Sequence, residues 1–134
     1  MFKKGFVFLW VCLFAVVIGF WGCKGTMVGG QGGGSYELKR SMTAPNYMEA
    51  SVKGDIENIH TAVLAGIADL GLIVKEDSYD KVSEIVEGTF ADNDSFIIKL
   101  AHQADGTIQI RIRVGLTGNK DRSVQIFQAI SGHF

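Results

Sequence analysis

Cys23 is the residue whose type and position point most directly to a specific chemistry. The chain holds two cysteines, Cys12 inside an uncharged apolar segment and Cys23 directly after that segment. No cysteine follows Cys23, so the remainder of the chain cannot form an internal disulfide. A single thiol at the end of an apolar segment is better explained by a covalent use other than a disulfide.

The residues before Cys23 have the order of a secretory signal. Two lysines form a basic start, residues 5–21 are uncharged and mainly apolar, and Gly22 is small. With Cys23 next, the segment resembles a lipobox, where the thiol receives a diacylglyceryl group and a peptidase cuts before the cysteine. We therefore expect residues 1–22 to be a signal peptide, cut between Gly22 and Cys23.

Lipid on Cys23 would anchor the protein to a membrane, because several acyl chains bind far more firmly than one. Two alternatives stay open, since Phe20 and Trp21 are bulky for positions just before a lipidated cysteine. One is an uncleaved transmembrane anchor, although the apolar run is slightly short of the about 20 residues that span a bilayer. The other is ordinary secretion after cleavage.

Lys24 stands where an aspartate would signal retention in the inner membrane, so we expect a location at the outer membrane, facing the periplasm.

The histidines and acidic residues form no known catalytic or metal-binding pattern. His60, His102 and His133 lack the spacing of a zinc site, and His60 is interpreted as a packed residue at the border of a helix's apolar stripe. Asp92 and Asp94 lack the glycine and glutamate of a calcium loop and are interpreted as a solvated turn. No nucleophile elbow is present. We predict that the protein is not an enzyme and has no catalytic residues, metal site or cofactor.

Composition and charge exclude several classes of partner. The chain has 134 residues, of which 47% are hydrophobic, and this length suits one small domain. From Cys23 on, eleven basic residues stand against fourteen acidic ones, a net charge of −3. Such a chain has no basic footprint for nucleic acid and no polybasic patch for anionic lipid.

Glycine composition divides the remainder into a tether and a domain. Residues 23–35 are rich in glycine and are expected to be a flexible tether, followed by a single domain at 36–134. A phosphate-binding glycine loop is a poor alternative, because it needs a flanking strand, a following helix and usually a Lys-Ser/Thr pair. Close packing of these glycines against a membrane or a partner is a second alternative.

Hydrophobic periodicity in the domain predicts five strands. They are expected over residues 46–53, 72–76, 82–90, 95–102 and 107–114. On the third of these strands, Val82, Val86 and Phe90 are expected to share one face. Residues 78–81 are expected to form a turn, and residues 36–40 are left open between a short strand and an extended lead-in.

Apolar residues at three- and four-residue steps predict two helices. The first is expected to begin after the N-cap residue Asp55 and to end before Gly71. The second is expected to begin at Asn119 or Asp121 and to end at Gly132. Its predicted apolar stripe is Val124, Phe127 and Ile130, with Ile126 at the edge.

The order of these elements is β-α-β-β-β-β-α. Consecutive strands joined by short turns form an antiparallel sheet. Two amphipathic helices would cover one face of it, so the sequence predicts a two-layer α+β sandwich.

Several motifs resemble a known family, domain-of-unknown-function family 3568, which consists of small bacterial lipoproteins. They are the lipobox with the glycine-rich stretch, the helix end at 65–72, the strand 110–115, Gly118 and the segment 123–130. The sequence departs from the family at 118–121, where it reads Gly-Asn-Lys-Asp and members usually read Gly-Asp. The resemblance implies an envelope lipoprotein without an established activity, and it provides no catalytic residues to transfer.

The uncovered face of the predicted sheet is the main candidate for a binding surface. If both helices cover one side, the other side presents the following residues: Arg111, Arg113, Lys99, Glu87, Ile85 and Ile97. A solvated face with cross-strand ion pairs is one interpretation. The other is a docking surface for an envelope protein partner or a second copy, since apolar residues rimmed by charges are typical of such surfaces.

These observations predict a bacterial envelope lipoprotein that acts as a membrane-tethered, non-enzymatic interaction or assembly module. The alternative is a periplasmic binding module that holds a lipid or another apolar ligand between the sheet and the helices. Its expected contacts are the membrane, through Cys23, and an envelope protein, with no nucleic acid.

Overall fold

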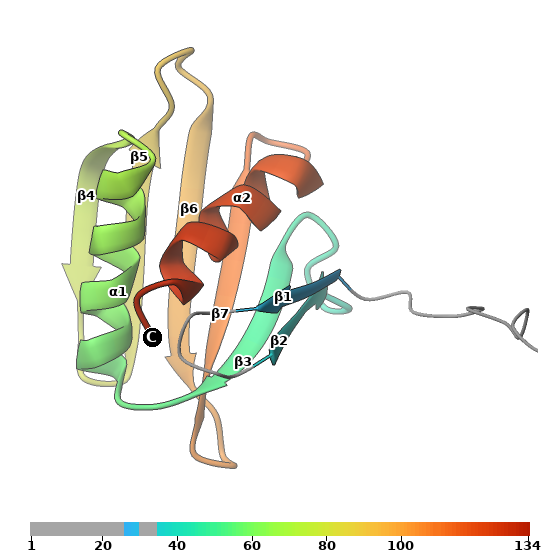
Figure 1. Cartoon of the computed structure of the whole chain (residues 1–134), viewed down its shortest axis with the longest axis vertical. Coiled ribbons are helices and arrows are strands. Elements are labelled where there is room, and N and C mark those ends of the chain that lie inside the picture. The colour runs from blue at the N-terminus through green and yellow to red at the C-terminus, as the bar shows by residue number, and fades with distance from the viewer. Residues whose placement is uncertain (1–25, 30–34) are drawn as a thin grey trace, which may run out of the picture.

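The computed structural model describes residues 26–29 and 35–134 (Figure 1). Its elements are β1 (Thr26–Gly29), β2 (Ser35–Arg40), β3 (Met48–Lys53), α1 (Ile56–Asp69), β4 (Ile73–Tyr79), β5 (Ser83–Thr89), β6 (Ser95–His102), β7 (Thr107–Val114) and α2 (Lys120–Ser131). From β3 onward the order matches the predicted β-α-β-β-β-β-α, and the α+β class is confirmed.

The strands form one antiparallel sheet in the order β1-β2-β3-β7-β6-β5-β4. Both helices lie on the same face of this sheet, as Figure 1 shows. The core lies between the two layers, and apolar side chains from β3, β5, β6, β7, α1 and α2 fill it. On β7, Ile108, Ile110, Ile112 and Val114 are fully buried, so strict alternation divides this strand into an inner and an outer face.

The two helices touch closely at one glycine. A Cβ atom on Gly66 of α1 would lie 2.7 Å from the backbone nitrogen of Ile130 in α2. No other residue type fits there without moving one helix away from the other. This contact fixes how α1 and α2 lie on the sheet. Among the described residues, neither helix has the length and apolar character needed to cross a bilayer.

The helix ends agree with the predicted boundaries, with one difference in chemistry. Asn119 is the N-cap of α2, and its side chain accepts a hydrogen bond from the backbone N–H of Arg122 at 3.1 Å. Asp55 occupies the N-cap position of α1, but its side chain makes no capping hydrogen bond. Gly71 follows the end of α1 with φ of +65°, the left-handed conformation that ends many helices.

Several predicted details are corrected by the structure. β4 continues to Tyr79, through part of the predicted turn at 78–81, because residues 76–79 pair in register with β5. Val82 lies outside the strand and is 64% exposed, so it does not join Val86 in the core. Ile126 is fully buried and belongs to the centre of the α2 stripe rather than to its edge.

Part of the predicted tether is a strand. Thr26–Gly29 form β1 and pair antiparallel with β2, which extends the sheet beyond β3. The stretch 36–40, left open from the sequence, belongs to β2. Ser35, the last residue of the predicted tether, is the first of β2. The predicted signal peptide 1–22, the predicted cleavage site Gly22–Cys23 and residues 23–25 and 30–34 of the predicted tether lie outside the described residues.

Candidate functional site

The residues predicted to form a partner surface lie together on the face that the helices leave uncovered. The strand register aligns them in two rows across β5, β6 and β7: Glu87, Ile97 and Arg113 in one row, and Ile85, Lys99 and Arg111 in the other. Their neighbours along each strand, such as Ile98 and Ile112, are buried on the helix side. Register and alternation therefore place all six side chains on one outer surface.

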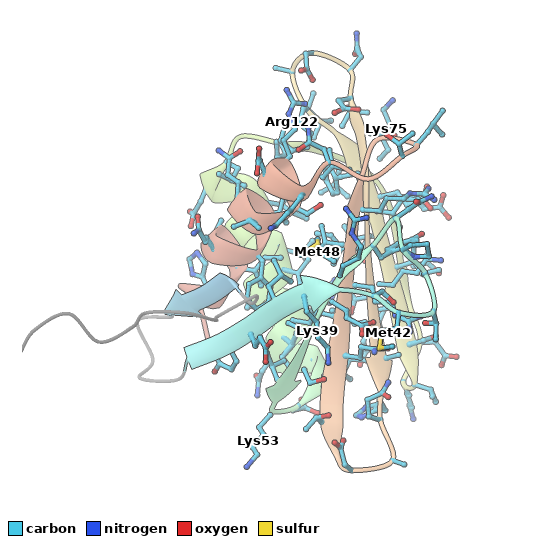
Figure 2. All side chains as sticks on the ribbon, turned by 90° about the vertical axis from the view of Figure 1, so that its right-hand side faces the viewer. Lys39, Met42, Met48, Lys53, Lys75 and Arg122 are labelled. Atoms are coloured by element: carbon cyan, nitrogen blue, oxygen red, sulfur yellow. The ribbon has the colours of Figure 1, made fainter. Side chains whose placement is uncertain are left out.

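The loop between β2 and β3 covers one side of this surface. The Tyr47 ring centre lies 5.4 Å from Lys99 Nζ and 5.1 Å from Arg113 Cζ, within the range of cation–π contacts. Arg111 Nη2 donates a hydrogen bond of 3.1 Å to Thr43 Oγ1 in the same loop. Met42, also in this loop and labelled in Figure 2, is 93% exposed. The outer face is thus open over β4 and β5 and partly covered over β6 and β7.

A second cluster, not predicted from the sequence, lies at the opposite face near the β4 edge. It joins His60 of α1, Asp77 of β4 and Glu84 of β5. His60 Nε2 lies 3.0 Å from Asp77 Oδ2 and 3.1 Å from Glu84 Oε1. The ligand-capable atoms of the three residues all lie within 4.8 Å of one another.

Strand pairing explains why these side chains meet. Glu84 pairs with Tyr79 and with Leu100, and Leu100 is a core residue, so Glu84 points toward the helix layer. Asp77 pairs with Val86, another core residue, and therefore faces the same way. His60 lies above them on α1, and its ring stacks on the Tyr79 ring at 5.6 Å between centres and 12° between planes.

Glu84 is an unusual residue for a core position. The residue is 1% exposed, and neither carboxylate oxygen has a hydrogen-bond partner among the described residues. Burial raises the pKa of Glu84 to about 7; the nearby His60 opposes this rise and Asp77 adds to it. His60 and Asp77 are partly open to solvent, with side-chain exposures of 20% and 32%. The cluster therefore has one buried carboxylate and one open side.

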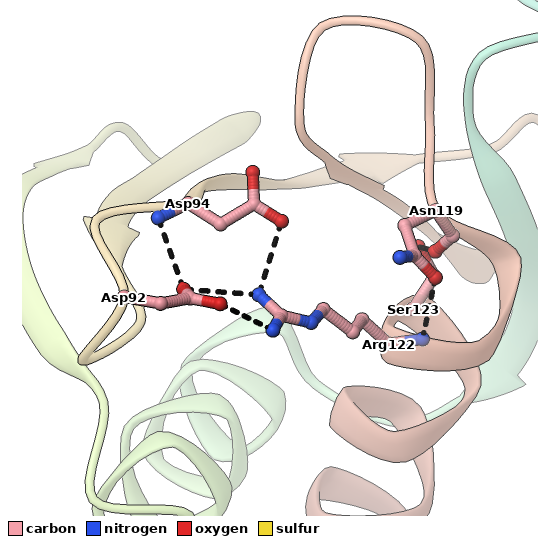
Figure 3. Close-up of polar contacts among 5 residues, drawn as sticks. All are labelled: Asp92, Asp94, Asn119, Arg122 and Ser123. Carbon is pink, nitrogen blue, oxygen red and sulfur yellow. Dashed lines mark hydrogen bonds and ion pairs between the residues drawn. The ribbon is translucent and has the colours of Figure 1, made fainter.

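A third group of charges ties a hairpin turn to α2. Arg122 donates hydrogen bonds to Asp92 Oδ1 at 3.1 Å and to Asp94 Oδ2 at 3.0 Å, as Figure 3 shows. Its guanidinium also lies over the Phe90 ring, 4.6 Å from the ring centre. The hydrogen bond from Arg122 and the one from the Asp94 backbone N–H lower the pKa of Asp92 to about 2. The predicted solvated turn is thus an ion-pair site with a structural role.

The other predicted chemical groups do not come together. His133 pairs with Asp69, and both side chains are well exposed. His102 is exposed at the end of β6. A pocket of about 530 Å³ lies between α1, β2 and the C-terminal residues, and its walls include Tyr36, Ile59, Lys53, Asn58, His133 and Phe134. The wall of this pocket is mixed in polarity.

Comparison with other sequences identifies the family but no characterised relative. No curated protein matches the chain. The sequence does match, over residues 7–133, the family described as "Protein of unknown function (DUF3568)". This match includes every element from β1 to α2 and the motifs at 65–72, 110–115 and 123–130. The chain therefore belongs to the DUF3568 family.

Proposed function

We propose that this protein is a bacterial envelope lipoprotein, anchored through Cys23 at the outer membrane and facing the periplasm, and that it acts as a non-enzymatic interaction module. The order of basic, apolar and small residues before Cys23 supports the anchor. The absence of any cysteine after Cys23 supports a thiol reserved for lipid. The uncovered sheet face supports a docking role.

The anchor is tested by comparing two cysteine variants of the full chain in its native membrane. Cys23→Ala should abolish incorporation of a labelled fatty acid and should accumulate as an uncleaved precursor. Cys12→Ala is the matched control, because this cysteine lies inside the segment that is removed, and it should be labelled and processed normally. A native polypeptide that keeps Met1 and an unmodified Cys23 thiol, measured by mass spectrometry, would contradict the anchor.

The distribution of charge on the uncovered face is the observation that carries the docking role. Glu76 of β4 pairs with Glu87 of β5, so two acidic side chains lie side by side on this face. Lys99 of β6 and the two arginines of β7 form a basic zone directly beside them. Ile85 and Ile97 lie where the two zones meet. In strand order, the face thus has acidic residues on β4 and β5, the two isoleucines, and basic residues on β6 and β7, of which Arg111 is paired at 3.4 Å with Glu49 of β3.

This pattern fits a second copy of the same chain as the partner. When two copies face each other across a two-fold axis parallel to the strands and between β5 and β6, the acidic zone of each lies against the basic zone of the other. In this arrangement β5 of each copy lies against β6 of the other, so Ile85 and Ile97 lie close to the axis, and Arg113 of β7 lies opposite Glu76 of β4. Opposite charges in contact favour this arrangement over one with like zones together.

Cross-linking in the membrane tests this partner. A cysteine placed by Ile97→Cys is the only thiol of the domain, because no natural cysteine follows Cys23. Under mild oxidation it should form disulfide-linked dimers several-fold more than Leu116→Cys, a control at a position that is 84% exposed in the turn before α2. Equal cross-linking of the two variants would contradict a dimer through this face.

Charge exchange gives a second test of the same interface. Arg113→Glu should weaken self-association, since it places acid against acid. Mixing this variant with Glu76→Arg chains, in which the residue that faces Arg113 is changed, should restore the association as a heterodimer, measured by co-purification of two differently tagged copies. No recovery in the mixture would show that the two zones do not face each other.

Binding of an apolar ligand is the second candidate function. The pocket of about 530 Å³ beside α1 has the volume of a small-molecule site, which is roughly 300–1,000 Å³. Tyr36, Ile59 and Phe134 give it an apolar part, and Lys53 and His133 give it a polar part. A mixed wall suits an amphiphile better than a fully apolar ligand. Binding of a fluorescent fatty acid that is blocked by Thr61→Trp, at an exposed residue of the pocket wall, would favour this function.

A further inference from the structure

The cluster of His60, Asp77 and Glu84 has more acceptors than donors. His60 Nε2 offers one N–H, and that N–H is hydrogen-bonded to Asp77 Oδ2. Glu84 Oε1 is 3.1 Å from the same nitrogen, but neither oxygen of Glu84 has a hydrogen-bond partner. A buried carboxylate without a donor is unfavourable, so a cation at this point would supply what the protein groups lack.

We propose that His60, Asp77 and Glu84 bind a divalent first-row transition-metal ion of the Zn²⁺ class. Two ligands bonded to such an ion at about 2.1 Å, at angles near 90–109°, lie roughly 3.0–3.4 Å apart. The observed separations from His60 Nε2, 3.0 and 3.1 Å, fall in this range. The ion would replace the hydrogen on Nε2 and would bridge all three side chains.

The chemistry of the ligands selects the class of ion. One imidazole nitrogen with two carboxylate oxygens suits Zn²⁺ and its first-row neighbours, whereas Mg²⁺ and Ca²⁺ prefer sites made only of oxygen. Two carboxylates and a neutral imidazole also balance the charge of a divalent ion. His60 and Asp77 are partly exposed, so the ion can enter from solvent and keep water on its open side.

Three elements that are distant in sequence would be joined by the ion. Every residue of β4 is exposed, and this strand forms one edge of the sheet. Its Asp77 is hydrogen-bonded to His60 of α1, and the stacked rings of His60 and Tyr79 support the same contact between β4 and α1. A metal ion would therefore hold the edge strand β4 against α1, in addition to β5.

Zinc binding by the full chain, purified in detergent and stripped with EDTA, tests the proposal. One Zn²⁺ per chain should bind in competition with a chromophoric chelator and should raise the Tm, and Mg²⁺ at the same concentration should not. Co²⁺ in place of Zn²⁺ should give visible absorption bands of a nitrogen- and oxygen-bound ion. His60→Gln, Asp77→Asn and Glu84→Gln should each weaken Zn²⁺ binding by more than about tenfold, since even second-shell losses cost about 10–100-fold.

Two matched controls separate this site from other histidines and carboxylates. Glu87→Gln changes a glutamate on the same strand but on the opposite face, and His133→Gln changes a histidine that has only one carboxylate beside it. Both should bind Zn²⁺ as the unchanged protein does. Circular dichroism verifies that each variant is folded, and Asp77→Asn, at a partly exposed residue, keeps the test valid if Glu84→Gln does not fold. No stoichiometric binding, or equal binding by ligand and control variants, would overturn the proposal.

Discussion

Two groups of carboxylates in this small protein have opposite surroundings. Asp92 and Asp94 lie at an exposed hairpin turn and share the several N–H donors of Arg122. Glu84 and Asp77 lie at the helix side of the sheet and share a single nitrogen of His60. The pKa of Asp92 is lowered to about 2, while the pKa of Glu84 is raised to about 7. The pKa of a carboxyl group is thus shifted in opposite directions at the two sites.

The difference lies in the number of donors and in burial. At the turn, a guanidinium provides parallel hydrogen bonds and a full positive charge, so the carboxylates are stable in their charged form. At the β4 edge, desolvation dominates, and Glu84 accepts no hydrogen bond from a described residue although His60 Nε2 lies 3.1 Å from its Oε1. A carboxylate that is fully paired with hydrogen-bond donors stabilises the fold. A buried carboxylate without hydrogen bonds instead indicates a site that a further bound group would complete.

Replacement of Glu84 should have the largest effect on stability. In metal-free protein, Glu84→Leu should raise the free energy of unfolding by about 1–3 kcal/mol, because it removes a buried carboxylate that accepts no hydrogen bond from a described residue. Urea denaturation in EDTA measures this change. The control is Glu87→Leu on the outer face, which should change stability little. A loss of stability in Glu84→Leu would mean that the carboxylate is already well compensated.

Replacement of Arg122 should have a smaller effect, and in the opposite direction. Arg122→Met keeps part of the packing on Phe90 but removes the donors for Asp92 and Asp94. Because the ion pairs are exposed to solvent, the loss of stability should be smaller than the gain in Glu84→Leu. The same denaturation experiment is repeated at high salt. Because salt screens the ion pairs, the difference in free energy of unfolding between Arg122→Met and the unchanged protein should then be smaller. No salt effect would mean that packing rather than charge holds the turn.

The weakest effect expected is a change in acid sensitivity. Asp92 has a pKa lowered from 3.8 to about 2 in the folded protein, so its stabilising contribution is present above about pH 4 and is lost as the pH falls toward 2. Asp92→Asn should therefore flatten the decline of stability between pH 4 and pH 2. Asp55→Asn, at a side chain without a capping bond, is the control and should keep the normal decline. Equal slopes in all three proteins would contradict the ion pair.

Much of the fold could be predicted because every second residue of its inner strands is a large apolar residue that faces the core. The predicted strands 95–102 and 107–114 have the same bounds as β6 and β7, since isoleucine and phenylalanine at every second position leave no other register. β1 was missed because four residues between glycines carry no periodic pattern. β4 was predicted too short because Asp77, Ser78 and Tyr79 have the composition of a turn.

The candidate sites differ in how far sequence could reveal them. The six outer residues were predicted together, because alternation alone assigns them to one face. Glu84 could also have been found, since it occupies the inward position two residues before Val86 and breaks an apolar pattern. Its meeting with His60 and Asp77 could not, because it depends on the register of β4 against β5 and on the position of α1 above them.

The position of β1 has a consequence for how the protein would stand on a membrane. Thr26, where β1 begins, is three residues after Cys23, a stretch of chain that spans at most about 11 Å. β1 and β4 are at opposite edges of a seven-stranded sheet, roughly 29 Å apart at about 4.8 Å per strand. With lipid on Cys23, the β1 edge would rest near the bilayer and the β4 edge would point into the periplasm. Ions arriving from the periplasm would then meet His60 and Asp77 at the end of the molecule farthest from the lipid.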